Sequence, residues 1–168
     1  MPEALRLEVL PGLAVEWEIA ALMRAADSPN PAAPPTWSLR GEVDWDQLES
    51  LRLVYGAVAE EALAIVVARP AGAESHADDR VAVAFVHPGG TEGAEEALLS
   101  TEYDAGGEMR RLGIELWLTD RTGKRIAADR SGDAQASVAD GLSRQVTPLA
   151  VRLGGSSGAG LHELLRPR

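Results

Sequence analysis

The chain has 168 residues, of which 45% are hydrophobic and 25% are charged, and its formal net charge is −10. This length suits one domain spanning residues 1–168 with a sizeable core, and the composition is that of a folded chain rather than a disordered one. The acidity argues against nucleic acid and against an anionic membrane surface as partners, because both attract clustered basic residues.

The residue types also indicate the setting in which the chain works. It contains no cysteine, which excludes disulfides and thiolate chemistry and fits a reducing compartment. Neither a signal-peptide pattern nor an apolar run of about 20 residues is visible, so we expect a soluble cytoplasmic protein. Lys124 is the single lysine among sixteen basic residues, a usage that indicates a GC-rich bacterial genome.

The N-terminal segment carries two competing patterns. Leu5, Leu7 and Val9 alternate with polar residues before a Pro11-Gly12 turn, and this alternation predicts a strand. The next stretch, LAVEWEIAALMRAAD, continues the alternation but is rich in helix formers. We predict a helix over about Leu13 to Ala26, and a strand pair is the alternative.

A proline-rich segment, DSPNPAAPPT, covers residues 27–36 and predicts a stiff loop, because proline supports neither a helix nor a strand ladder. After this loop the alternation of Trp37, Leu39, Val43 and Trp45 predicts one strand with both tryptophans on the same face. The following DWDQLES predicts a single helical turn.

The remainder of the chain predicts a series of strands joined by short links. Two runs, Ala62–Arg69 and Arg80–His87, are apolar on both faces, which is typical of strands covered from both sides. Short turns at DAGG and DRTGK indicate an antiparallel meander. The fold class that follows is mainly β: an antiparallel meander forming a lipocalin-like barrel or a β-sandwich, with one N-terminal helix or strand pair.

The strand within MRRLGIELWL has two unlike faces. Leu112, Ile114 and Leu116 alternate on one face, which we assign to the core. Glu115 and Trp117 share the other face with an arginine and a glycine, so that face is either solvated or part of a site. Solvation is the simpler interpretation.

Two short motifs suggest chemistry but have simpler explanations. GGSSG matches a hydrolase elbow with Ser156 as the nucleophile and His162 downstream, yet a glycine-rich hairpin turn explains it better, because only ten residues follow it. ESHADD places Glu74, His76, Asp78 and Asp79 within six residues, but an acidic loop matches this equally well. We therefore predict neither a metal nor a cofactor.

The residues that we assign to a ligand-binding site are mainly aromatic. Tryptophans wall apolar pockets in barrel mouths, although core packing is their commoner role. A carboxylate or a histidine placed beside them would be available for acid–base chemistry. The predicted ligand-binding set is Trp117, Glu115, Trp37, Trp45, Tyr103 and His87.

The C-terminal half resembles a known family. ALLSTEYDAGGEMRRLGIELWL and PLAVRLGGSSGAGLHEL, within Ala97 to Pro167, look like parts of the lipocalin-like domains related to carotenoid hydratases. The resemblance implies a β-barrel and apolar, terpenoid- or polyketide-like ligands, but it carries no catalytic residue over to this chain.

Three functions remain open at this stage. The first is a protein that binds an apolar small molecule within a barrel. The second is a non-catalytic interaction domain that forms a homodimer through an exposed strand. The third is a small metal-free enzyme, such as a cyclase, isomerase or hydratase, that uses a buried carboxylate or histidine.

Overall fold

The computed structural model describes residues 4–42, 44–87, 90–118, 123–139 and 141–167. Its described elements comprise strands, one α-helix and two 3-10 turns. The N-terminal elements are β1 (Ala4–Leu10), β2 (Leu13–Glu18), α1 (Ile19–Asp27), β3 (Trp37–Arg40) and η1 (Trp45–Gln47). The later elements are β4 (Leu48–Val58), β5 (Glu61–Pro70), η2 (His76–Asp78), β6 (Arg80–His87), β7 (Gly90–Tyr103), β8 (Met109–Leu118), β9 (Gly123–Arg130), β10 (Gln135–Ala139), β11 (Leu142–Leu153) and β12 (Ser156–Pro167).

The main sheet is antiparallel and curls until its two ends meet. Its strands follow the order β10-β11-β12-β4-β5-β6-β7-β8-β9, and β9 also pairs with β11, from Leu149 opposite Arg130 to Leu153 opposite Ile126. Within the described residues this extra pairing closes β4–β9, β11 and β12 into a ring. The predicted antiparallel barrel is thus confirmed, and closure leaves few exposed strand edges.

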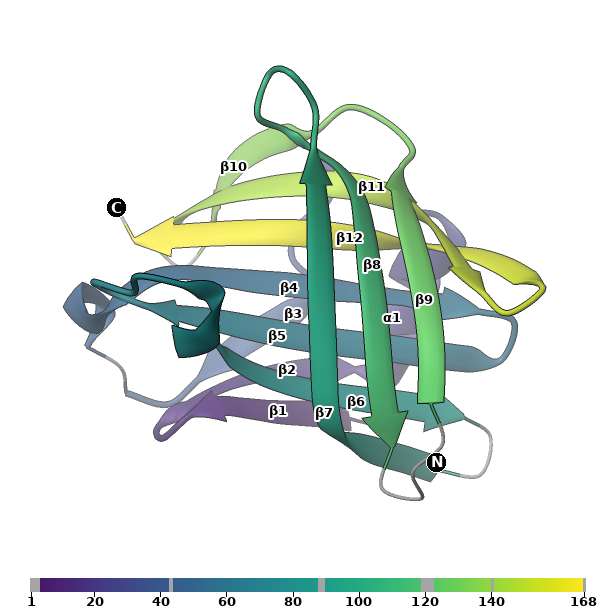
Figure 1. The fold of residues 1–168 in the computed structure, drawn as a ribbon, viewed down its shortest axis with the longest axis horizontal. Helices are drawn as coiled ribbons and strands as arrows, with labels where there is room; N and C mark the ends of the chain where they lie inside the picture. Colours follow the sequence, from purple (N-terminus) through teal and green to yellow (C-terminus); the bar gives the residue numbers. More distant parts are fainter. Residues whose placement is uncertain (1–3, 43, 88–89, 119–122, 140, 168) are drawn as a thin grey trace.

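Figure 1 shows how the ring is flattened. Strands β7, β8 and β9 cross in front of β4, β5, β11 and β12 at a steep angle, so the barrel has two facing walls. The side chains between these walls form one apolar core, to which Ile65, Phe85 and Ile114 belong. Leu112, Ile114 and Leu116 are all buried, which confirms that the apolar face of β8 points inward.

A third layer covers the outside of the barrel. Strands β1, β2 and β3 form a separate sheet, and this sheet and α1 lie behind the barrel in Figure 1. Helix α1 packs against β4 and β12, and β1 packs against β5 and β6. A second apolar core fills this interface and includes Trp17, Leu53 and Val66. Strand β5 is therefore buried on both faces, as its continuous apolar sequence predicts.

Two expectations about the N-terminal part require correction. The predicted helix over Leu13 to Ala26 is wrong in its first six residues, because Leu13–Glu18 form β2 and the helix begins at Ile19. Pairing with β1 and β3 outweighs the helix-forming residues there, and it buries Val15 and Trp17 in the outer core.

The predicted strand from Trp37 to Trp45 also differs from the structure. It ends at Arg40, because Gly41 takes a φ of +111° and lies against the backbone of Gly12. Trp45 instead begins the 3-10 turn η1, so the two tryptophans do not share a strand face. The single helical turn predicted for this segment is confirmed.

The later turns follow the sequence pattern. The DAGG turn joins β7 to β8, and Gly154 at φ +60° starts the tight turn between β11 and β12, so Ser156 already lies in a strand. The turn predicted at DRTGK includes residues 120–122, which lie outside the described residues. Of the helices in the described segments, none has the length and apolarity that a membrane crossing requires.

Candidate functional site

One end of the barrel holds a polar cavity. Its volume is about 290 Å³, at the lower end of the range for small-molecule sites. Because the strands are antiparallel, its walls come from the beginnings of β4, β8 and β11 and from the ends of β5, β7, β9 and β12. The most relevant lining residues are Arg52, Thr101, Tyr103, Gln145, Thr147 and His162. We refer to this cavity as the polar mouth.

Strand periodicity places the two central side chains of the polar mouth. Val54 belongs to the inner core and is opposite His162 on β12, so Arg52, two residues earlier, also faces inward. Arg52 in turn pairs with Leu164, one step nearer the rim. Each of these two cross-strand pairs therefore places one polar and one apolar side chain on the inner wall: His162 beside Val54, and Arg52 beside Leu164 nearer the rim.

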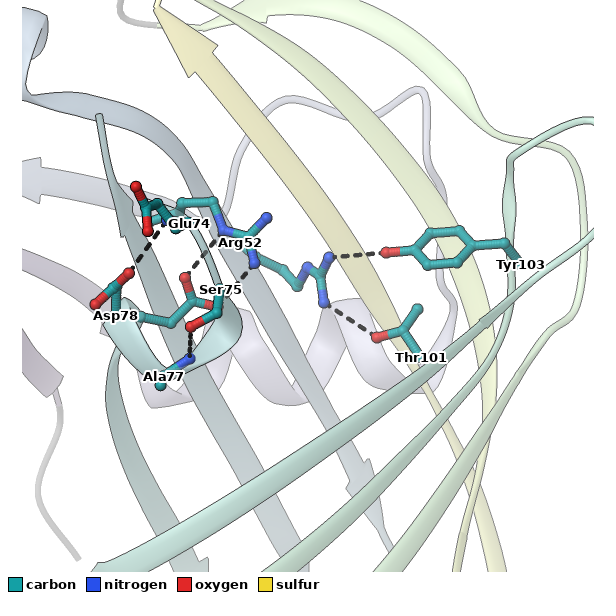
Figure 2. A network of polar contacts seen from close by, with 9 residues as sticks. Arg52, Glu74, Ser75, Ala77, Asp78, Thr101 and Tyr103 are labelled. Atoms are coloured by element: carbon teal, nitrogen blue, oxygen red, sulfur yellow. Dashed lines mark hydrogen bonds and ion pairs between the residues drawn. The ribbon is translucent and has the colours of Figure 1, made fainter. Parts of the chain in front are cut away.

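Arg52 reaches across the polar mouth to β7. Its Nη1 donates to Thr101 Oγ1 at 3.2 Å, and its Nη2 donates to the Tyr103 hydroxyl at 3.3 Å. Figure 2 shows the guanidinium extended towards these two residues, with the turn that contains Ser75 and Asp78 on its other side. In the described part of the chain, neither hydrogen-bond partner of Arg52 is charged.

His162 lies deeper in the same cavity. Its side chain is buried, with 6% exposed, and its Nε2 has no hydrogen-bond partner among the described residues. Burial, assisted by the nearby charge of Arg52, lowers the pKa of His162 from 6.5 to about 3. The imidazole is therefore neutral near pH 7. An unsatisfied polar atom at this depth is uncommon in folded proteins.

The rim of the polar mouth carries ion pairs. Arg69 binds Asp79 through two hydrogen bonds of 3.0 and 3.3 Å, and Arg130 pairs with Asp104 at 3.3 Å and with Glu108 at 2.8 Å. Backbone N–H groups, chiefly that of Glu108, hold the pKa of the Asp104 carboxyl below its usual range. These two arginines are compensated by carboxylates, in contrast to Arg52.

Among the described residues, apolar side chains fill most of the barrel interior beyond the polar mouth. Beyond His162, side chains such as Leu63, Phe85 and Ile126 leave a cavity of only about 20 Å³. That space accommodates little more than one water molecule. A broad, open depression lies beside the β4–β5 and β11–β12 turns, against the outer surface of β8 and β9. Of these cavities in the described part of the chain, the polar mouth is the one that enters the barrel end and has room for a ligand.

The residues predicted for the site are dispersed. Tyr103 lines the polar mouth. Glu115 and Trp117 lie on the outer face of β8, where Glu115 pairs with Arg125 at 3.2 Å. His87 ends β6 beside Glu92, with 3.7 Å between His87 Nε2 and the Glu92 carboxylate. The two remaining residues, Trp37 and Trp45, pack in the outer core.

Sequence reasoning passed over the central residues of the polar mouth. The sequence pattern placed His162 only downstream of Ser156 in the GGSSG motif, and it assigned no role to Arg52. The available signal was polarity within an apolar strand: Arg52 stands between buried Leu51 and Leu53, and His162 follows buried Leu161. The predicted acidic loop is present around η2, where Glu74 N donates to Asp78 Oδ2 at 3.2 Å. No metal-binding group of three or more side chains occurs in the described segments.

A second polar cluster lies on the other side of the same wall, between the barrel and the outer layer. The Glu163 carboxylate accepts hydrogen bonds from Arg144 Nε at 2.5 Å, from Trp37 Nε1 at 2.9 Å and from the Tyr55 hydroxyl. Arg144 also donates to the Ala33 carbonyl at 3.1 Å, which ties down the proline-rich loop. We call this set the buried clasp.

The buried clasp is closed to solvent. The side chains of Arg144 and Glu163 are only 3% and 0% exposed. Burial, followed by the charge of Glu163, raises the pKa of Tyr55, which keeps its phenol protonated. Each member has a partner and the cavities described above lie elsewhere, so the clasp attaches the outer layer and leaves no room for a ligand.

The fold is a lipocalin-like antiparallel β-barrel, here with an extra layer on one side. Kievitone hydratase from Nectria haematococca has a similar fold, with a TM-score of 0.50 and 9% sequence identity. The match covers 77% of this chain and 43% of the hydratase chain, so this chain spans less than half of its length. No protein-family model matches the chain, and neither does any curated protein.

Proposed function

We propose that this protein binds a small molecule in the polar mouth. The observation that carries the proposal is a cavity of about 290 Å³ that contains both a half-buried guanidinium with neutral partners and a buried imidazole with an unpartnered Nε2. Unsatisfied polar groups and an uncompensated cation cost stability, and a bound ligand would offset that cost. The fold supports the proposal, because barrels of this kind hold ligands at their mouths.

The ligand differs from the wholly apolar one that the sequence suggested. The apolar part of the barrel has only about 20 Å³ of free space, whereas the larger cavity is bordered by Arg52, Thr101 and Tyr103. A polar or amphiphilic molecule matches these walls. Its apolar part would contact Val67, Met109 and Leu164, which also line the cavity.

Binding is better supported than catalysis. A general base works best when its pKa lies near the working pH, and the pKa of His162 is far below that range. Asp79 and Glu108, two carboxylates that line the cavity, are held by Arg69 and Arg130. The similarity to kievitone hydratase concerns the fold alone, so we infer no reaction from it.

The test is a fragment screen with a probe inside the cavity. None of the four tryptophans lines the polar mouth, so their fluorescence would not report binding there. We would instead follow the ring resonances of His162 by NMR while adding fragments at millimolar concentration. Fragments that occupy the mouth should shift the His162 resonances and raise the melting temperature.

Two variants of one strand provide the control. Gln145→Trp places a bulky ring at the entrance of the polar mouth and should abolish the shifts. Ala150→Trp adds the same ring to an exposed position of β11 outside the mouth, and binding should persist. If no fragment perturbs His162 in the unmodified protein, or if Gln145→Trp binds as well as Ala150→Trp, the proposal is wrong.

A further inference from the structure

We propose that the ligand of the polar mouth is a small organic carboxylic acid, whose carboxylate binds Arg52 and whose apolar body points towards His162. This inference rests on the proposed function and specifies the chemical class of the ligand.

The first support is the set of donors that Arg52 has left. A guanidinium carries five N–H donors, and Arg52 uses one on Thr101 and one on Tyr103. Three donors therefore remain for a ligand. The two hydroxyls hold the guanidinium plane in position across the mouth, so the order needed for binding already exists in the free protein. A planar fork of donors matches the two oxygens of a carboxylate.

The second support is the charge distribution in the cavity. Arg69 and Arg130 are neutralised by Asp79, Asp104 and Glu108 at the rim. Arg52 has no carboxylate within ion-pair distance among the described residues, so the half-buried part of the mouth retains its positive charge. Glu49 and Arg166 also line the cavity, but both are exposed and their charges are of opposite sign. An anion compensates that charge, whereas a cationic ligand would lie beside Arg52 and be repelled.

The third support is the absence of charged side chains from the described residues His162, Val67 and Met109 that line the inner part of the cavity. His162 lines the cavity and carries no charge near pH 7, and its buried Nε2 has no hydrogen-bond partner among the described residues. Val67 and Met109 are buried and line the same space. The inner part of the mouth therefore suits an uncharged, mostly apolar body, while the charge of the ligand stays at Arg52.

The net charge of the ligand's head group distinguishes a carboxylate from a phosphate as the expected ligand. A phosphate monoester carries about −1.5 to −2 at pH 7 and accepts several strong hydrogen bonds. Arg52 is the half-buried guanidinium of the described lining that has no carboxylate partner, whereas Arg166 and Glu49 are exposed and carry charges of opposite sign, and the described lining includes no lysine. One positive charge balances one negative charge, so we assign a monoanion.

The experiment uses four probes that share one ring and differ in the head group: benzoate, phenyl phosphate, benzyl alcohol and benzylamine. Binding to the full chain is measured by isothermal titration calorimetry, and occupancy of the mouth is measured through the His162 resonances. Benzoate should bind most tightly and should shift those resonances. Its affinity should fall as the salt concentration rises, because the contact is ionic.

Three variants test the contact itself. Arg52→Gln should weaken benzoate binding by roughly tenfold to a hundredfold, the effect of losing a charge-assisted hydrogen bond. Arg52→Lys keeps the charge without the fork and should give an intermediate loss. Arg111→Gln removes an exposed arginine that pairs with Asp129 outside the barrel, so benzoate binding should not change.

The outcomes distinguish the two levels of the proposal. If benzyl alcohol or benzylamine shifts His162 at least as strongly as benzoate, the carboxylate assignment is wrong, while the polar mouth remains a binding site. Tighter binding of phenyl phosphate also overturns the assignment. If no probe and no fragment binds, both the inference and the proposed function are wrong. Equal affinity in Arg52→Gln and Arg111→Gln rejects the role of Arg52, even if benzoate binds.

Discussion

His162 and Glu163 are neighbours on β12, yet their side chains point to opposite sides of the barrel wall and into opposite environments. Glu163 belongs to the buried clasp, where Arg144, Tyr55 and Trp37 satisfy its carboxylate. His162 belongs to the polar mouth, where its Nε2 has no described partner. The clasp is closed and compensated, whereas the mouth is open and incompletely satisfied.

The two arginines repeat this contrast. Arg144 is almost fully buried and binds a carboxylate, while Arg52 is half-buried and binds two hydroxyls. A buried ion pair is destabilising to break, because the remaining partner becomes an uncompensated charge. A lone arginine in an open cavity remains partly solvated and is available to a ligand. The comparison predicts that mutations in the clasp change stability and that mutations in the mouth change binding.

The largest effect should come from breaking the clasp. Glu163→Gln keeps the shape but leaves Arg144 without a counter-charge, so the free energy of unfolding should fall by about 3–5 kcal/mol. Urea denaturation followed by circular dichroism measures it. Asp129→Asn is the control, since Asp129 bridges Arg111 and Arg152 at the surface, and it should cost about 1 kcal/mol or less. Equal losses in the two variants would contradict the distinction.

A double-mutant cycle would sharpen the same point. Arg144→Met removes the guanidinium, and Glu163→Gln retains an acceptor for Trp37 and Tyr55. Each single variant leaves one buried charge, but the double variant leaves none. The double variant should therefore lose about 2 kcal/mol less free energy of unfolding than the sum of the two single-variant losses. Strict additivity in urea denaturation would show that the two charges do not stabilise each other.

The polar mouth should make the free energy of unfolding depend on pH through His162. The folded pKa of His162 is about 3, below its unfolded value of 6.5, so the unfolded chain binds the proton between these values. Stability from this group is therefore present above pH 6.5 and falls with decreasing pH, by up to about 1.4 kcal/mol per unit. His162→Gln should remove that slope from the unfolding free energy measured between pH 6.5 and 4.5.

Thr147→Val is the matched control for the pH experiment. Thr147 pairs with His162 across β11 and β12 and lines the same cavity, but it does not titrate. This variant should keep the pH slope of the unmodified protein, whatever its effect on absolute stability. A slope that survives in His162→Gln would mean that other groups cause it.

The smallest effect on stability should come from Arg52. Its two hydrogen bonds go to hydroxyls near the opening, and Tyr103 is 54% exposed. Arg52→Gln should therefore change the free energy of unfolding by about 1 kcal/mol or less. Thermal and urea unfolding of this variant measure it. A loss as large as that of Glu163→Gln would make Arg52 a structural residue and would remove the contrast between the two regions.

The sequence alone determined β1, most strands from β4 onwards and much of their orientation. The period of two in LGIELWL identified Leu112, Ile114 and Leu116 as core, and the continuous apolar run of β5 indicated a strand covered on both faces. Short turns between the strands required antiparallel pairing. These features are local, because alternation and turn residues act within a few positions of the chain.

Only the tertiary structure decided where the polar side chains meet. Arg52 and Tyr103 are 51 positions apart, and Arg144 reaches Ala33 across 111 positions. Such contacts depend on the closing pair of β9 with β11 and on the outer layer that covers β4 and β12. Alternation shows that His162 and Glu163 face opposite sides of a strand. The closure of the sheet and the docking of α1 determine which side becomes a cavity and which becomes a core.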